Sequence, residues 1–213
     1  KIFDSGIFSA GEYCKNFKFE ISKCLEVKYS HLTTSATTAL WLCLKLLKID
    51  SSDEVIVSDF SFPATANVVE DLGAKPIFAD VSLNTFNMNP EELIKLISPK
   101  TKAVIFVDSL GNPSGIKRIQ DICKSKKIPL IEDAACAIGS KIDGKNCGSF
   151  SDIACLSFHP RKLICTGEGG AILTGREEFS QWLDIKLRHG ASRRDEVGMI
   201  FDDFGYNFRL SEF

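Results

Sequence analysis

Short apolar runs alternate with longer amphipathic stretches along most of this chain. Val55-Ile56-Val57 and Val104-Ile105-Phe106 are examples, and each run is followed by turn-forming or helix-forming residues. Runs of this length, rich in β-branched residues, are typical of strands buried on both faces of a sheet. We predict strands at residues 29–34, 54–57, 75–79, 103–107, 129–131, 153–156 and 171–173.

Between these strands the apolar spacing predicts helices. One begins at Pro63, which suits a first helical turn, and Gly73 closes it. Other helices are predicted at 39–47, 89–97, 116 to about 126 and 177–188, with a weaker helical pattern within 1–28. Strands that alternate with helices of about 10–14 residues favour a mostly parallel sheet. We expect a single α/β domain with about seven strands and helices on both faces.

Composition and charge exclude some classes of protein. Apolar residues make up 44% and charged residues 25% of the 213 residues, as in an ordinary globular chain. The net charge of −2 provides no basic surface for nucleic acid or an anionic membrane. No apolar run approaches the ~20 residues that span a bilayer, and no basic-then-apolar leader is present. We therefore expect a cytoplasmic protein with no nucleic-acid or membrane partner.

The eight cysteines include no Cys-x-x-Cys pair. Cys43 and Cys155 lie inside apolar segments, where cysteine behaves as a small hydrophobic residue. We expect reduced, mostly structural thiols and no metal site.

The chain begins at Lys1 and stops at Phe213, just after residues 206–211, which resemble the start of a helix or strand. We expect residues 1–213 to be the large domain of a longer protein.

The segment from Ser157 to Gly170 connects two of the predicted buried strands. Loops at strand ends are where α/β proteins place their chemistry. Lys162 lies in this loop, and a lysine amine can form a Schiff base with a carbonyl group. Alone, Lys162 could equally be an ordinary solvated lysine.

Other strand ends carry further candidates. Ser35-Ala36-Thr37 opens a helix, which suits either phosphate binding or an ordinary N-cap. Asp133 ends a buried strand, where a carboxylate needs a cation such as a protonated ring nitrogen, or caps a loop. Asp108 ends the preceding strand. Phe62 either stacks on a ring or belongs to the core, and Ser157 either donates to phosphate or merely ends a strand.

Together these residues form an ordered set of motifs. Ser35-Ala36-Thr37, Phe62 and the segments 132–135, 157–162, 166–170, 188–190 and 205–209 occur in that order over nearly the whole chain. The set resembles the DegT/DnrJ/EryC1/StrS family of pyridoxal-phosphate sugar aminotransferases, which have the aspartate aminotransferase fold (fold type I).

The resemblance implies roles by position. Lys162 matches the lysine that binds the cofactor covalently, and Asp133 matches the partner of the pyridine nitrogen. Phe62 matches the aromatic residue that stacks on the ring. The phosphate cradle corresponds to Ala36, Thr37 and Ser157. Asn207 matches an asparagine that reaches the phosphate held by the neighbouring subunit, so the resemblance also implies a homodimer with shared active sites.

The implied reaction moves an amino group from glutamate or glutamine to a keto group on a nucleotide-linked deoxysugar, in polysaccharide or amino-sugar biosynthesis. Two features depart from the family pattern. Cys136 stands where the family often has Gln or His near the cofactor's phenolic oxygen, and a thiol is a weaker donor. Family members are also roughly twice as long, so an N-terminal segment and a C-terminal small domain are expected outside this chain.

Three alternatives to this function can be compared with the sequence. A sugar dehydratase of the same family carries histidine at the position of Lys162, which argues against it. A catalytically incomplete module would keep the fold without a complete site. A nicotinamide-binding domain needs Gly-x-Gly-x-x-Gly after the first strand, and residues 35–38 do not match it.

Overall fold

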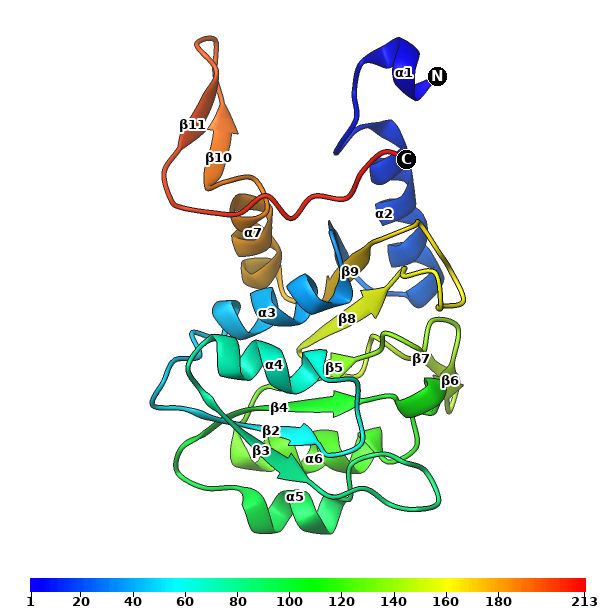
Figure 1. The fold of residues 1–213 in the computed structure, drawn as a ribbon, viewed down its shortest axis with the longest axis vertical. Helices are drawn as coiled ribbons and strands as arrows, with labels where there is room; N and C mark the ends of the chain where they lie inside the picture. The colour runs from blue at the N-terminus through cyan, green and yellow to red at the C-terminus, as the bar shows by residue number, and fades with distance from the viewer.

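The computed structural model of the chain describes residues 1–213, except for the side chain of Arg194. Its main sheet has seven strands in the order β1-β9-β8-β5-β4-β2-β3 (Figure 1). The strands are β1 (Tyr29–Thr33), β2 (Glu54–Ser58), β3 (Lys75–Ala79), β4 (Thr101–Val107), β5 (Leu130–Asp133), β8 (Ile153–Ser157) and β9 (Gly170–Thr174). Only β9 runs antiparallel to its neighbours β1 and β8. The predicted mostly parallel sheet is confirmed.

Helices cover both faces of this sheet. They are α2 (Glu12–Leu25), α3 (Ala36–Leu46), α4 (Ala64–Asp71), α5 (Pro90–Leu96), α6 (Ile116–Lys126) and α7 (Glu177–Lys186), with a 3₁₀ turn at Ser109–Gly111. The short α1 (Ile2–Ser5) buries no residue and lies apart from the sheet at the N-terminus (Figure 1). Alternate residues of one strand point to opposite faces. Val55 and Val57 accordingly belong to the core cluster that includes residues of α3, α4 and α7, whereas Ile56 belongs to the cluster with residues of α5 and α6. The apolar runs seen in the sequence therefore contribute side chains to the hydrophobic core on both faces of the sheet.

Local signals fix several element ends. Pro63 precedes α4, and Gly73 follows it with a φ of 76°. The side chain of Asn89 accepts a hydrogen bond from the backbone N–H of Glu91 and caps α5. The predicted turn at 142–145 joins a small hairpin of β6 (Lys141–Ile142) and β7 (Lys145–Asn146). These ends lie close to the predicted ones because short-range chemistry sets them.

Two regions differ from expectation. A hairpin of β10 (Ala191–Arg194) and β11 (Met199–Phe201) was not predicted, and it projects from the body beyond α7 (Figure 1). Its strands are short and mostly exposed, so no buried face marks them in the sequence. The expected start of an element at residues 206–211 is wrong. This segment is extended and forms a single bridge between Ser211 and Ser9.

Long-range contacts hold that extended segment in place. The Glu212 carboxylate accepts hydrogen bonds from the backbone N–H groups of Gly11, Tyr13 and Cys14, at 2.7, 3.0 and 3.0 Å. These groups belong to the first turn of α2, where N–H groups lack partners within the helix. A carboxylate nearly two hundred residues away thus caps this helix. In the described part of the chain, no helix combines the length and apolar character needed to cross a membrane.

Candidate active site

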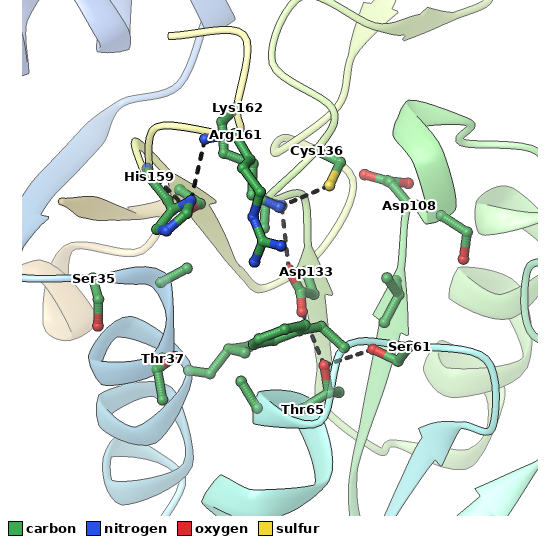
Figure 2. Close-up of a pocket in the computed structure, with 18 of the residues that line it drawn as sticks. Ser35, Thr37, Ser61, Thr65, Asp108, Asp133, Cys136, His159, Arg161 and Lys162 are labelled. Atoms are coloured by element: carbon green, nitrogen blue, oxygen red, sulfur yellow. Dashed lines mark hydrogen bonds between the residues drawn. The ribbon is translucent and has the colours of Figure 1, made fainter. Parts of the chain in front are cut away.

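A pocket of about 510 Å³ lies where β1, β2, β4, β5 and β8 end. The carboxyl ends of these parallel strands share one edge of the sheet, and the loop from β8 to β9 closes over it. The pocket brings together most of the predicted site residues: Ala36, Thr37, Phe62, Asp133, Cys136, Ser157 and Lys162. Residues spread over more than a hundred positions therefore meet at one place (Figure 2).

Asp133 ends β5 at the base of this pocket and is only 6% exposed. Its Oδ2 accepts a hydrogen bond from Thr65 Oγ1 at 3.1 Å, and its Oδ1 accepts one from the backbone N–H of Ala135 at 3.2 Å. Burial raises the pKa of Asp133, while these two donors and the charge of Lys162 oppose that rise. A buried carboxylate beside an open pocket can accept a cationic group there.

Lys162 lies in the loop from β8 to β9, and backbone contacts hold this loop in shape. The backbone N–H of Lys162 donates a hydrogen bond to the carbonyl of His159 at 2.8 Å. Across the loop, the backbone N–H of Phe158 donates one to the carbonyl of Gly169 at 2.9 Å. The Lys162 side chain is half-buried, and its Nζ donates a hydrogen bond to Sγ of Cys136 at 2.9 Å (Figure 2). The amine therefore lies inside the pocket rather than in free solvent.

The start of α3 forms another wall of the pocket. Ser35 caps this helix in a capping box with Thr38, so the N-cap interpretation of Ser35 is correct. Ala36 and Thr37, the next residues, line the pocket at the positive end of the helix dipole. Gly170 packs against this turn: a Cβ there would lie 2.5 Å from the carbonyl carbon of Ser35. Only glycine allows the loop and the helix start to approach so closely.

Phe62 is 66% exposed and lines the pocket, so its interpretation as a core residue is wrong. An exposed ring on a pocket wall can stack on a flat ligand.

Asn207 is exposed and is not among the residues that line the pocket in the described part of the chain. Next to it, the rings of Tyr206 and Phe208 stack with centroids 5.2 Å apart, and Trp41 meets Tyr206 edge-on at 4.9 Å.

The chain segment that carries Asn207 is anchored to α7. The Lys186 side chain is almost fully buried, and its Nζ forms a salt bridge of 2.7 Å with Asp203. The same Nζ donates a hydrogen bond of 2.8 Å to the carbonyl of Phe204. Asn207 therefore has a fixed position on the surface of this chain.

A second acidic group borders the pocket, and its member Asp108 is one of the lining residues. Asp108, Glu132 and Cys147 are buried, and one ligand atom from each lies within 4.8 Å of the others. Burial and the adjacent Glu132 carboxylate raise the pKa of Asp108 to about 9. Burial also raises the pKa of Glu132, against backbone N–H donors at Gly148 and Phe150. Both Asp108 oxygens are buried without a hydrogen-bond partner, so the neutral, protonated carboxyl is favoured there at neutral pH.

Several pocket residues were not predicted. Thr65 lies in the first turn of α4, three residues after Phe62, which precedes the helix, and this spacing could have revealed it. Arg161, His159 and Glu168 also line the pocket, and His159 Nε2 lies 4.0 Å from Glu168 Oε1. These side chains come from a loop without periodicity, so the sequence gives no signal of their direction.

Comparisons with known proteins match this arrangement. The model of the DegT/DnrJ/EryC1/StrS aminotransferase family matches residues 1–213. A GDP-perosamine synthase of Escherichia coli O157:H7 is 35% identical over 206 residues, which are 96% of this chain and 56% of the relative. A UDP-N-acetyl-3-dehydro-alpha-D-glucosamine 3-aminotransferase of Acidithiobacillus ferrooxidans is 37% identical, over 100% of this chain and 57% of the relative.

Solved structures agree as well. The Helicobacter pylori aminotransferase PseC, involved in pseudaminic acid biosynthesis, superposes with a TM-score of 0.92 at 32% identity, covering 99% of this chain and 57% of that one. An aminotransferase of Psychrobacter cryohalolentis gives 0.95 at 30% identity, covering 99% and 56%. The chain thus spans little more than half the length of these proteins. The fold and the resemblance predicted from the sequence are confirmed, and the chain belongs to the DegT/DnrJ/EryC1/StrS aminotransferase family.

Proposed function

We propose that this chain is the cofactor-binding large domain of a pyridoxal-phosphate-dependent aminotransferase. The protein would move an amino group from glutamate or glutamine to a keto group on a nucleotide-linked sugar. The observation that carries the proposal is the meeting of Lys162 and Asp133 in one pocket, from separate loops. The names of the relatives, which include GDP- and UDP-sugar enzymes, support the class of acceptor. A structure of a related sugar aminotransferase in its pyridoxal-phosphate form supports the cofactor.

The residues of the pocket fit this cofactor. The buried Asp133 carboxylate suits a protonated pyridine nitrogen, and Phe62 offers an exposed ring for stacking. The start of α3, with Ala36 and Thr37, suits a phosphate, and Ser157 adds a hydroxyl. When bound, pyridoxal phosphate supplies an aldehyde that holds the amino group and a ring that accepts electrons.

The chain's own groups then have separate tasks. Lys162 has an amine that can bind a carbonyl group, and once released it can move a proton as general base and then general acid. Asp133 keeps the proton on the ring nitrogen because Thr65 and Ala135 hold its carboxylate in place. Cys136 lies within 2.9 Å of Lys162 and orients its amine. The flat wall at Phe62 fixes the plane of the ring.

We also propose the setting in which this domain works. Residues 1–213 form the large domain, and the C-terminal small domain of the relatives completes the site. Asn207, exposed and outside the pocket of its own chain, reaches the phosphate bound by a second subunit, so the protein is a homodimer. We further place the protein in the cytoplasm and its reaction in polysaccharide or amino-sugar biosynthesis, and the nucleotide-sugar names of the relatives support this class of reaction.

The test is a half-reaction with the full-length protein. Purified protein is loaded with pyridoxal phosphate, glutamate or glutamine is added, and the loss of the absorbance of the lysine-bound cofactor is followed. A panel of nucleotide-linked keto-sugars is then added to restore the absorbance. The proposal expects at least one donor and one sugar to act in sequence. Failure of every donor to change the spectrum of the loaded protein would contradict it.

A further inference from the structure

Cys136 and Lys162 come from different loops and touch inside the pocket. Cys136 follows β5, and Lys162 lies between β8 and β9. The Nζ of Lys162 lies 2.9 Å from Sγ of Cys136, which is direct contact (Figure 2). The thiol is exposed and the amine is half-buried, so small molecules that enter the pocket reach both.

The other thiols are placed differently. Five cysteines are buried: Cys14, Cys43, Cys123, Cys147 and Cys155. Burial raises the pKa of Cys14 and Cys123 to about 12, which keeps their thiols protonated and unreactive. Two further cysteines, Cys24 and Cys165, are exposed. Among the side chains that the structure describes, Cys136 is the cysteine whose sulfur contacts a lysine amine.

We propose that peroxides convert this pair into a covalent sulfur–nitrogen crosslink between Cys136 and Lys162. In the first step the sulfur of Cys136 attacks one peroxide oxygen and the O–O bond breaks. The products are a sulfenic acid on Cys136 and one water. The sulfur is oxidised by two electrons, and the peroxide is reduced by two.

In the second step the Lys162 ammonium loses a proton to solvent, and the free amine attacks the sulfenic sulfur. The new bond joins Nζ and Sγ, the S–O bond breaks, and hydroxide leaves with a second proton from the nitrogen as water. Sulfenic acids condense in this way with backbone nitrogen, and here a side-chain amine is already in contact. The long lysine stem closes the remaining gap by rotation.

The consequence of this crosslink rests on the proposed function, since it would remove the amine that holds the cofactor. Oxidation of the cofactor-free protein would then block loading until a thiol reductant cleaves the S–N bond. A carbonyl cofactor already held by Lys162 would prevent the crosslink, because the amine is no longer free to attack.

The experiment uses the cofactor-free full-length protein and hydrogen peroxide. After treatment and trypsin digestion, mass spectrometry measures the peptides that contain residues 136 and 162. The expected product is one joined species that is about 2 Da lighter than the sum of its two peptides, with no cleavage after Lys162. Dithiothreitol should restore both separate peptides. Cys136→Ser should abolish the product, and the matched variant Cys165→Ser, in the same loop as Lys162, should still form it.

Two results would overturn the proposal. One is peroxide oxidation of Cys136 to sulfinic acid with no peptide joined to Lys162. The other is a joined product in which Cys136 is bound to a different cysteine in both wild type and Cys165→Ser. Both results are measured on cofactor-free protein and do not depend on the cofactor. Failure of the crosslink can therefore be distinguished from failure of the proposed aminotransferase function, which the half-reaction measures separately.

Discussion

Thr65 donates a hydrogen bond of 3.1 Å to the carboxylate of Asp133. The two residues come from different elements: Thr65 lies on α4 and Asp133 ends β5. Thr65 is itself buried, and Ser61 shares a hydrogen bond with its hydroxyl at 2.8 Å. This chain of hydroxyls fixes the orientation of the carboxylate that the proposed function places against the cofactor ring.

Thr65→Val should weaken that orientation while keeping the shape of the side chain. The lost hydrogen bond to a charged group is worth roughly 1.5–3 kcal/mol, so turnover of the loaded full-length protein should fall about tenfold or more. Steady-state kinetics with donor and acceptor measure this. Ser61→Ala, which removes only the outer hydroxyl, serves as the matched control and should have a smaller effect. Equal turnover in Thr65→Val and wild type would show that the hydrogen bond is dispensable.

Asp133→Asn should bind the cofactor but lose most turnover. A neutral amide cannot stabilise a proton on the ring nitrogen, although it keeps the size and one acceptor of aspartate. We expect a loss of roughly 100-fold or more, by analogy with the removal of one electrostatic group from other active sites. Cofactor absorbance measures binding and steady-state assays measure turnover. Rates within a few-fold of wild type would remove Asp133 from the mechanism.

The buried pair of Asp108 and Glu132 should make stability depend on pH. An aspartate in an unfolded chain has a pKa near 3.9, whereas that of Asp108 is raised to about 9. Between these values the folded chain keeps a proton that the unfolded chain has released, so stability falls as pH rises from about 4 to about 9.

Asp108→Asn cannot release a proton, so this decline should disappear. At pH 8 the variant should be more stable than wild type by at least about 1 kcal/mol, because a neutral amide never places a charge at this buried position beside Glu132. Urea unfolding at several pH values measures the difference. Asp121→Asn, an exposed change on α6, should follow the wild-type profile. If stability declined in parallel with pH for wild type and Asp108→Asn, the raised pKa of Asp108 would be refuted.

Glu212 should make stability depend on pH in the opposite direction to Asp108, with stability lost as the pH falls. Burial raises the pKa of its carboxyl, but hydrogen bonds from Cys14 and from the start of α2 outweigh burial, so the pKa is lowered overall. Its contribution to stability is present above the unfolded pKa near 4.3 and is lost as pH falls through the lower folded value.

Glu212→Gln should therefore destabilise the chain at pH 7 by about 1–2 kcal/mol, since three backbone donors lose a charged acceptor. The difference from wild type should shrink as pH falls below 4. Thermal unfolding followed by circular dichroism measures it, with Glu20→Gln as the exposed control on α2. A difference that is the same at pH 3 and pH 7 would exclude the charge as its cause.

Local patterns explain why so much of the fold was predictable. The run Val104-Ile105-Phe106 is apolar on both faces, which only a strand covered by helices on both sides accommodates. The Pro63 and Gly73 signals depend on backbone geometry alone. The order of strands and the antiparallel direction of β9 depend on contacts between distant segments, so no local pattern contains them.

Some features of the candidate active site could also be predicted from the sequence, and others could not. Lys162, Asp133 and the Ser35-Ala36-Thr37 turn were predictable because strand ends collect at one edge of the sheet. The contact between Lys162 and Cys136 was not, since the loop that carries Lys162 has no repeating pattern and its path is set by backbone contacts. The capping of α2 by Glu212 escaped notice for a similar reason, because its partners lie at the other end of the chain.

The central claim is that Lys162 binds the cofactor. Loading the full-length protein with pyridoxal phosphate, reducing it with borohydride and mapping the peptides by mass spectrometry tests this most directly. The account predicts that the cofactor's mass is found on Lys162, and that Lys162→Ala loses both this label and the cofactor absorbance. A label on another lysine, or no label in a protein that binds the cofactor, would contradict it.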